Sequence, residues 1–213
     1  MAAVEFNSFL TLVLACLVSY IFGALPFAHR LSRRKGIDIF KTGTGLAGAS
    51  NVLKTVGKGS AVIVLVFDLA KGALAVIVSG MMGIEGSVIL IPAAFAVLGH
   101  WNSVFTRFKG GDGMAIGGGV AIALFGYFAI LALVVAALVS IFAQKLPFSS
   151  LTSIVFGYIS LVFSTSILAK NELGTLVLSF GVLAGLIFVH AVLGHSKRNK
   201  RTQIFEESET NQI

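Results

Sequence analysis

Apolar segments of membrane-crossing length follow one another along this chain, with only short polar stretches between them. Residues 6–27, 61–82 and 86–105 are three such segments. A helix needs about 20 apolar residues to cross the hydrocarbon core, where backbone groups must be satisfied internally. Charged residues make up 12% of the chain, whereas a soluble domain carries about 25%. The sequence therefore predicts an all-α, polytopic integral membrane protein.

The number of crossings depends on residues 114–144, an apolar stretch that can be counted once or twice. Two further segments, 148–168 and 173–193, follow it before a polar tail. One crossing gives six spans and puts Lys145 and the basic tail outside, against the rule that Lys and Arg stay in the cytoplasm. A reversal near residues 125–127 puts them inside. We therefore predict about seven segments, some short, with the N-terminus outside and the C-terminus cytoplasmic.

Basic residues gather in the parts of the chain that this arrangement assigns to the cytoplasm. Seven of the 16 lysines and arginines lie in residues 29–60, together with one acid, Asp38. The net charge of +7 thus reflects membrane topology rather than nucleic-acid binding. Cys16 is the only cysteine, so neither a cysteine-based metal site nor an intrachain disulfide is predicted. We assign residues 1–195 to a single membrane-embedded domain and residues 196–213 to a polar cytoplasmic tail.

Two glycine-rich polar runs share the pattern F-K-x-G-x-G, at residues 40–45 and 108–113. Glycine lets the backbone approach a phosphate closely and turn its N–H groups towards it. Arg107 and Lys109 add positive charge at the second run, and His100 precedes it as a group that can move a proton near neutral pH. We predict two phosphate-binding loops at one membrane face. The alternative is two polar turns between helices, with lysines that simply follow the topology rule.

Two charged residues, Asp68 and Lys71, interrupt the apolar segment 61–82 and share one face of its helix. An isolated charge in hydrocarbon is costly, so the two are predicted to pair or to line a polar cavity. The alternatives are a purely structural ion pair and a Lys71 side chain that extends to the membrane surface. Residues 45–56 are predicted to form a short helix at the interface, whose N-terminal N–H groups face an anion.

Three stretches of the sequence carry a resemblance to a known family. They are Gly43-Thr44-Gly45-x-x-Gly48-Ala49-Ser50-Asn51-Val52-Leu53-Lys54, Phe67-Asp68-Leu69-x-Lys71-Gly72 and Gly99-His100-x-x-x-Val104-Phe105-x-Arg107-Phe108-Lys109-Gly110-Gly111-x-Gly113. In that order they resemble the first signature, the second helix and the second signature of the bacterial acyl-phosphate:glycerol-3-phosphate acyltransferases, the PlsY family. His195 with Asn199 resembles a worn form of the third signature.

The resemblance implies that a fatty acyl group passes from acyl phosphate to the primary hydroxyl of glycerol 3-phosphate, giving lysophosphatidate and inorganic phosphate. It implies a multi-pass protein of the bacterial inner membrane whose active site faces the cytoplasm and which uses no metal or other cofactor. The expected partners are the two substrates and membrane lipids, not nucleic acid. Leu46, Lys54 and Asp112 replace the family's asparagine, arginine and lysine. A catalytically inactive relative and an organic-anion transporter therefore remain alternatives.

The predicted site combines both loops, the first mainly for glycerol 3-phosphate and the second mainly for acyl phosphate. Catalytic roles are assigned to His100 as candidate base, to Lys109 and to Thr44. Binding of substrate or phosphate is assigned to Lys41, Gly43, Gly45, Ser50, Asn51, Lys54, Arg107, Gly110, Gly111, Gly113 and His195. The leaving phosphate can itself accept the hydroxyl proton, so His100 is alternatively a hydrogen-bond donor to phosphate. Asp112 is predicted to cap a helix that begins near Met114.

Overall fold

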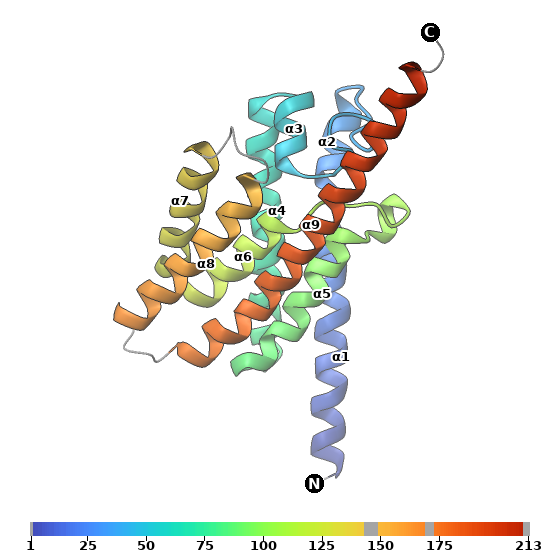
Figure 1. Cartoon of the computed structure of the whole chain (residues 1–213). Helices are drawn as coiled ribbons and strands as arrows, with labels where there is room; N and C mark the ends of the chain where they lie inside the picture. Colours follow the sequence, from blue (N-terminus) through green and yellow to red (C-terminus); the bar gives the residue numbers. More distant parts are fainter. Residues whose placement is uncertain (1, 143–148, 169–172, 211–213) are drawn as a thin grey trace.

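The computed structural model describes residues 2–142, 149–168 and 173–210. No β-strand occurs among these residues, and all their regular elements are helical. The longer helices are α1 (Ala2–Ala24), α4 (Lys58–Met81), α5 (Leu90–Trp101), α6 (Met114–Phe125), α7 (Tyr127–Phe142), α8 (Ser149–Leu168) and α9 (Gly174–Thr210) (Figure 1). Between them lie the shorter α2 (Phe27–Arg34) and α3 (Ala49–Thr55) and the 3-10 turns η1 (Gly86–Ile89) and η2 (Val104–Thr106).

The all-α prediction is confirmed, and each of the seven predicted segments contains a helix. In the described part of the chain, four helices are long and apolar enough to cross a membrane and three apolar helices are shorter: Ser8–Arg34, Lys58–Met81, Gly86–Thr106 and Gly174–Gly194, then Met114–Phe125, Tyr127–Phe142 and Leu151–Ile167. The predicted reversal near residues 125–127 occurs at Gly126, where a φ of 54° ends α6. Lys145 and the predicted segment ends at residues 144 and 148 lie outside the described residues.

Helix α6 is 12 residues long, which is too short to cross a bilayer by itself. Protein surrounds it, because α6 packs against α4 and its Ile116 and Val120 side chains are fully buried. Short helices are tolerated at membrane depth where other protein covers them. Glycines let the neighbouring helices approach closely: a Cβ on Gly99 of α5 would overlap the carbonyl oxygen of Tyr20 in α1.

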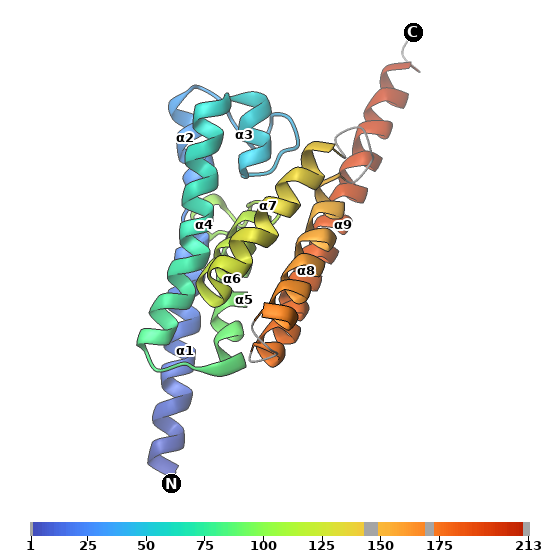
Figure 2. The same ribbon diagram turned by 90° about the vertical axis from the view of Figure 1, so that its left-hand side faces the viewer.

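The polar elements gather at one end of the bundle. Figures 1 and 2 show α2 and α3 at the end where α9 finishes, with the start of α1 at the opposite end. An odd number of segments produces this separation of the two ends. Helix α9 runs through residue 195 to Thr210, and the predicted domain boundary there remains a prediction. The short helix predicted at residues 45–56 is present as α3, from Ala49 to Thr55.

Candidate active site

Positively charged side chains line a cleft of about 870 Å³ at the polar end of the bundle. Its lysines and arginines are Arg30, Arg33 and Arg34 of α2, Lys41 of the first glycine-rich run, Lys109 of the second, and Arg107, which precedes the second run. Among the residues that the structure describes, Asp38 is the only acid that lines it. We call this space the basic cleft. Six cations against one carboxylate suit a ligand with several negative charges, and phosphate groups are such ligands.

The two F-K-x-G-x-G runs meet in this one cleft. The amide of Ala47 donates a hydrogen bond of 3.0 Å to the carbonyl oxygen of Gly110. The ammonium group of Lys109 lies 5.9 Å from the centre of the Phe40 ring, within cation–π range. Lys41 and Lys109 therefore face a common space, whereas the sequence assigned them mainly to different substrates. The two runs therefore contribute to one site.

A buried asparagine holds the first run in shape. The Asn51 side chain is 1% exposed, and its amide nitrogen donates to the carbonyl oxygens of Ile39, Thr42 and Leu46 at 2.9–3.1 Å. Its side-chain oxygen accepts from the amide of Thr44 at 3.0 Å. These backbone contacts engage both ends of the amide, so Asn51 shapes the loop rather than facing the basic cleft. Leu46 takes part through its carbonyl group.

The second run is folded back onto the end of α5. The amide of Gly111 donates to the carbonyl oxygen of His100 at 3.2 Å, and a Cβ on Gly110 would overlap that same oxygen. The Gly111 amide is therefore engaged inside the protein, contrary to its predicted role as a phosphate donor. Arg107 and Phe108 have φ angles of 55° and 60°, which are uncommon for residues other than glycine. This tight bend fixes where the exposed Arg107 leaves the backbone.

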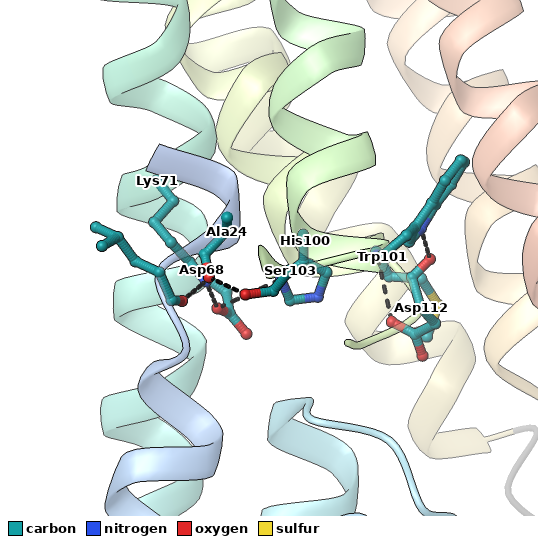
Figure 3. A network of polar contacts seen from close by, with 9 residues as sticks. Ala24, Asp68, Lys71, His100, Trp101, Ser103 and Asp112 are labelled. Carbon is teal, nitrogen blue, oxygen red and sulfur yellow. Dashed lines mark hydrogen bonds and ion pairs between the residues drawn. The ribbon is translucent and has the colours of Figure 1, made fainter. Parts of the chain in front are cut away.

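Beneath the second run lies a smaller cavity of about 20 Å³, which shares Pro26, Thr106 and Lys109 with the basic cleft. His100 lines this cavity with Asp68 and Lys71 (Figure 3). The ion pair predicted between Asp68 and Lys71 is present, with Nζ 2.7 Å from Oδ1. The His100 side chain is 6% exposed and does not line the basic cleft. A direct role as base therefore needs a path for the substrate hydroxyl past the second run.

Known proteins share both this sequence and this fold. Residues 13–203 match the protein family described as glycerol-3-phosphate acyltransferase. The chain belongs to this family. Glycerol-3-phosphate acyltransferase 1 of Deinococcus radiodurans is 45% identical over 111 residues, which are 52% of this chain and 56% of the relative. Glycerol-3-phosphate acyltransferase 5 of Dehalococcoides mccartyi is 39% identical over 139 residues, 65% of this chain and 60% of the relative. The chain thus matches little more than half the length of these relatives.

Two solved structures resemble nearly the whole chain. They are crystal structures of PlsY (YgiH), an integral membrane glycerol 3-phosphate acyltransferase, in its glycerol 3-phosphate form and its lysophosphatidic acid form. The first is 25% identical with a TM-score of 0.72, and the second 27% identical with a TM-score of 0.68. Each match covers 91% of this chain and 92% of the other. This acyltransferase-family chain is therefore an integral membrane protein of the PlsY fold.

Several predicted site residues of this family member lie away from the basic cleft. Thr44, Gly43, Gly45 and Gly113 belong to the two runs but do not line the cleft. Ser50 and Lys54 are exposed on α3 and line neither the cleft nor the smaller cavity. His195 lies in α9, and its side chain is outside the described part of the structure. The substrate-binding roles of these residues stay predictions, and the structure places their side chains outside the basic cleft where it describes them.

The sequence reading missed three arginines of the cleft. Arg30, Arg33 and Arg34 were assigned to membrane topology alone, although all three line the basic cleft. Their spacing offered a signal, because residues three and four positions apart share one face of a helix. Residues 29–60 contain seven lysines and arginines, and any cytoplasmic loop is rich in these residues. The three arginines on one helix face were therefore not distinguishable from the others by sequence.

Asp112, one departure from the family pattern, lies at the start of α6 and outside the lining of the basic cleft. Its carboxylate accepts a hydrogen bond from the amide of Met114 at 3.3 Å, at the start of α6. Its carbonyl oxygen accepts from the indole nitrogen of Trp101 at 2.9 Å (Figure 3). The N-cap position itself is Gly113, so Asp112 contacts the start of α6 from one residue before the predicted cap position, and it does not line the basic cleft. The carboxylate therefore does not directly oppose a phosphate bound there.

Proposed function

We propose that this protein transfers a fatty acyl group from acyl phosphate to the primary hydroxyl of glycerol 3-phosphate. The observation that carries the proposal is the basic cleft, where three arginines of α2, one lysine from each glycine-rich run and Arg107 face one space. Both proposed substrates are phosphates, so they repel one another and need shared cations to be held together. A membrane-embedded site also suits an acyl donor that is itself an amphiphile.

The proposed chemistry requires orientation and charge more than a dedicated nucleophile. The hydroxyl oxygen attacks the acyl carbonyl carbon, the bond from that carbon to the phosphate oxygen breaks, and the hydroxyl proton passes to the leaving phosphate. Lysophosphatidate and inorganic phosphate result. Lys41, Arg107 and Lys109 bind the phosphates and stabilise charge as phosphate departs. Holding both substrates in one cleft supplies the proximity that the reaction needs. Thr44 and Asn51 act by shaping the first run.

An apolar cavity offers room for part of the acyl chain. It has a volume of about 170 Å³ and lies among α6, α7, α8 and α9. Met114, the residue that follows Gly113 of the second run, is one of its lining residues. Small residues, among them Gly118, Ala132 and Ala136, keep the cavity open. We propose that this cavity holds part of the acyl chain of a donor whose phosphate lies in the basic cleft.

We predict that filling the apolar cavity shortens the acyl chain that the protein accepts. Ala136→Phe places a ring in the cavity, so turnover with palmitoyl phosphate should fall about tenfold or more while a short-chain acyl phosphate retains most of its rate. Ala137→Phe is the matched control, because Ala137 is the exposed neighbour on α7. Steady-state rates across a series of chain lengths provide the measurement. Equal losses at every length would argue against the cavity as the acyl site.

We also propose that the basic cleft faces the cytoplasm of a bacterial cell, with the N-terminus outside. Thr42 is exposed beside the cleft, and Glu85 is exposed in the turn between α4 and η1. In a Cys16→Ala background, Glu85→Cys should react with a membrane-impermeant maleimide in intact cells, whereas Thr42→Cys should react only after the membrane is opened. Labelling of Thr42→Cys in intact cells, with Glu85→Cys protected, would reverse the proposed orientation.

The direct test of the proposed function uses purified protein with palmitoyl phosphate and labelled glycerol 3-phosphate. We expect labelled lysophosphatidate and an equal amount of inorganic phosphate, and no product when palmitoyl-CoA replaces palmitoyl phosphate. Binding of both substrates without product would instead favour an inactive relative. Accumulation of unmodified glycerol 3-phosphate inside proteoliposomes would favour an anion transporter. Monodisperse protein that gives none of the expected product contradicts the proposal.

A further inference from the structure

Three ionisable residues form a buried group that does not touch the basic cleft. Asp68 and Lys71 of α4 are 1% and 4% exposed, and His100 of α5 is 6% exposed. We call them the buried charge cluster. Charged side chains at membrane depth are costly, and replacing a buried ion pair with apolar residues is often neutral or stabilising. Stability alone is therefore a weak reason for this group, and its contacts indicate a different role.

On one side, the cluster holds the break between α1 and α2. The ammonium group of Lys71 lies 2.7 Å from Asp68 Oδ1 and donates to the carbonyl oxygen of Leu25 at 2.9 Å (Figure 3). Leu25 follows the last residue of α1, where helix carbonyl groups lack partners within the helix. Helix α2 starts two residues later and carries the arginines of the basic cleft. Lys71 thus holds the backbone just before α2, the helix that carries the three arginines of the basic cleft.

On the other side, the cluster supports the second glycine-rich run. The Nδ1 atom of His100 lies 3.9 Å from Asp68 Oδ1, close enough for the two side chains to interact electrostatically. The His100 carbonyl oxygen accepts from the Gly111 amide, and its Nε2 atom lies against Gly111, where a Cβ would overlap it. The cluster therefore contacts the supports of two walls of the basic cleft: the Leu25 carbonyl group two residues before α2, and Gly111 of the second run.

We propose that Asp68 and Lys71 are positioning residues that set the separation between the α2 arginines and the Lys109 loop. This inference rests on the proposed function, because it assigns phosphate binding to the basic cleft. Neither residue lines that cleft, so neither contacts a phosphate bound there. Lys71 acts through the carbonyl group of Leu25, and Asp68 acts through the imidazole ring of His100. An ion pair that served only stability would not affect the position of α2 or of the second run.

The double variant Asp68→Leu/Lys71→Met separates the two roles. It removes both charges together, so no lone charge stays buried. Its thermal unfolding temperature should therefore stay close to that of the wild type. If the pair only stabilises the fold, the affinity of this variant for inorganic phosphate should also stay close to that of the wild type. If the pair positions the cleft, affinity for inorganic phosphate should stay at least about tenfold weaker, because small misplacements of binding groups are costly.

Inorganic phosphate is the probe, and its dissociation constant is measured by calorimetry or by ligand-induced thermal stabilisation. This readout needs no turnover, so it stays informative if the acyltransferase assay fails. Ser79→Ala is the control, because Ser79 is a buried polar residue of the same helix that contacts Ser19 rather than either wall. It should alter unfolding temperature at most. Wild-type affinity in a folded double variant overturns the inference, and so does a wild-type protein that binds no phosphate.

A second pair of variants applies if the double variant does not fold. Lys71→Arg retains the charge for Asp68 and a donor for Leu25, so phosphate affinity should stay within about threefold of wild type. Lys71→Gln retains a donor but lacks the charge, so affinity should fall at least about tenfold. Equal phosphate affinities for these two variants would overturn the positioning role.

Discussion

Gly110→Ala is expected to reduce kcat/KM about a hundredfold or more. A methyl group on Gly110 would overlap the carbonyl oxygen of His100 and lie 2.5 Å from the carbonyl oxygen of Trp101. Both neighbours are backbone at the end of α5, which the packing of α1 against α5 holds in place, so the second run must move instead. Lys109 precedes Gly110 and moves with it. A displacement of about 1 Å at a catalytic centre can cost about 100-fold in rate.

Gly48→Ala is the control for this substitution. Gly48 also belongs to the glycine-rich segments, but a Cβ there meets no atom within 4 Å, and its φ of −139° suits any residue. The Gly48 variant should keep kcat/KM within about threefold of wild type. Rates for both variants, with unfolding temperatures to verify folding, provide the comparison. A Gly110→Ala variant with nearly wild-type activity would show that the second run does not need its present position.

Much of the fold followed from local features of the sequence. Helix positions depend on segment length and hydrophobicity, and the reversal at Gly126 followed from counting lysines and arginines on each side of the membrane. The contact of Asp112 with the start of α6 was predictable for a similar reason, since it involves only the two residues that follow Asp112. These features require no knowledge of which distant segments meet.

The candidate site depends on contacts between distant segments, which a pattern does not reveal. A hydrogen bond joins Ala47, which follows the first run, to Gly110 of the second run. The two residues have 62 others between them in the chain. A Cβ on Gly110 or Gly111 would overlap an atom of His100, and the Gly111 amide donates to the His100 carbonyl oxygen. Packing against α5 therefore requires glycine at these two positions, whereas phosphate binding by the Gly110 amide stays a prediction. Asn51, expected to orient substrate, instead holds four backbone groups of its own loop.

Lys41→Ala and Lys109→Ala are each expected to weaken the use of both substrates. The two lysines line the same basic cleft, so each contributes to the field that holds both phosphates. Loss of one charge-assisted hydrogen bond should raise KM about tenfold or more. The sequence alone favoured a different outcome, in which Lys41 serves mainly glycerol 3-phosphate and Lys109 mainly acyl phosphate. The structure favours the shared effect, because Lys109 lies over Phe40, the neighbour of Lys41.

Lys54→Ala provides the control, because Lys54 is exposed on α3 and lies outside the basic cleft. It removes the same unit of charge, so it measures the effect of net charge on substrate attraction without removing a contact. At about 0.15 M salt that effect is screened beyond roughly 8 Å, and KM for either substrate should change less than about threefold. KM for each substrate is measured with the other saturating. The contrary result is that each variant raises KM for only one substrate, and that the two variants affect different substrates. That result would indicate two separate phosphate sites in place of one cleft.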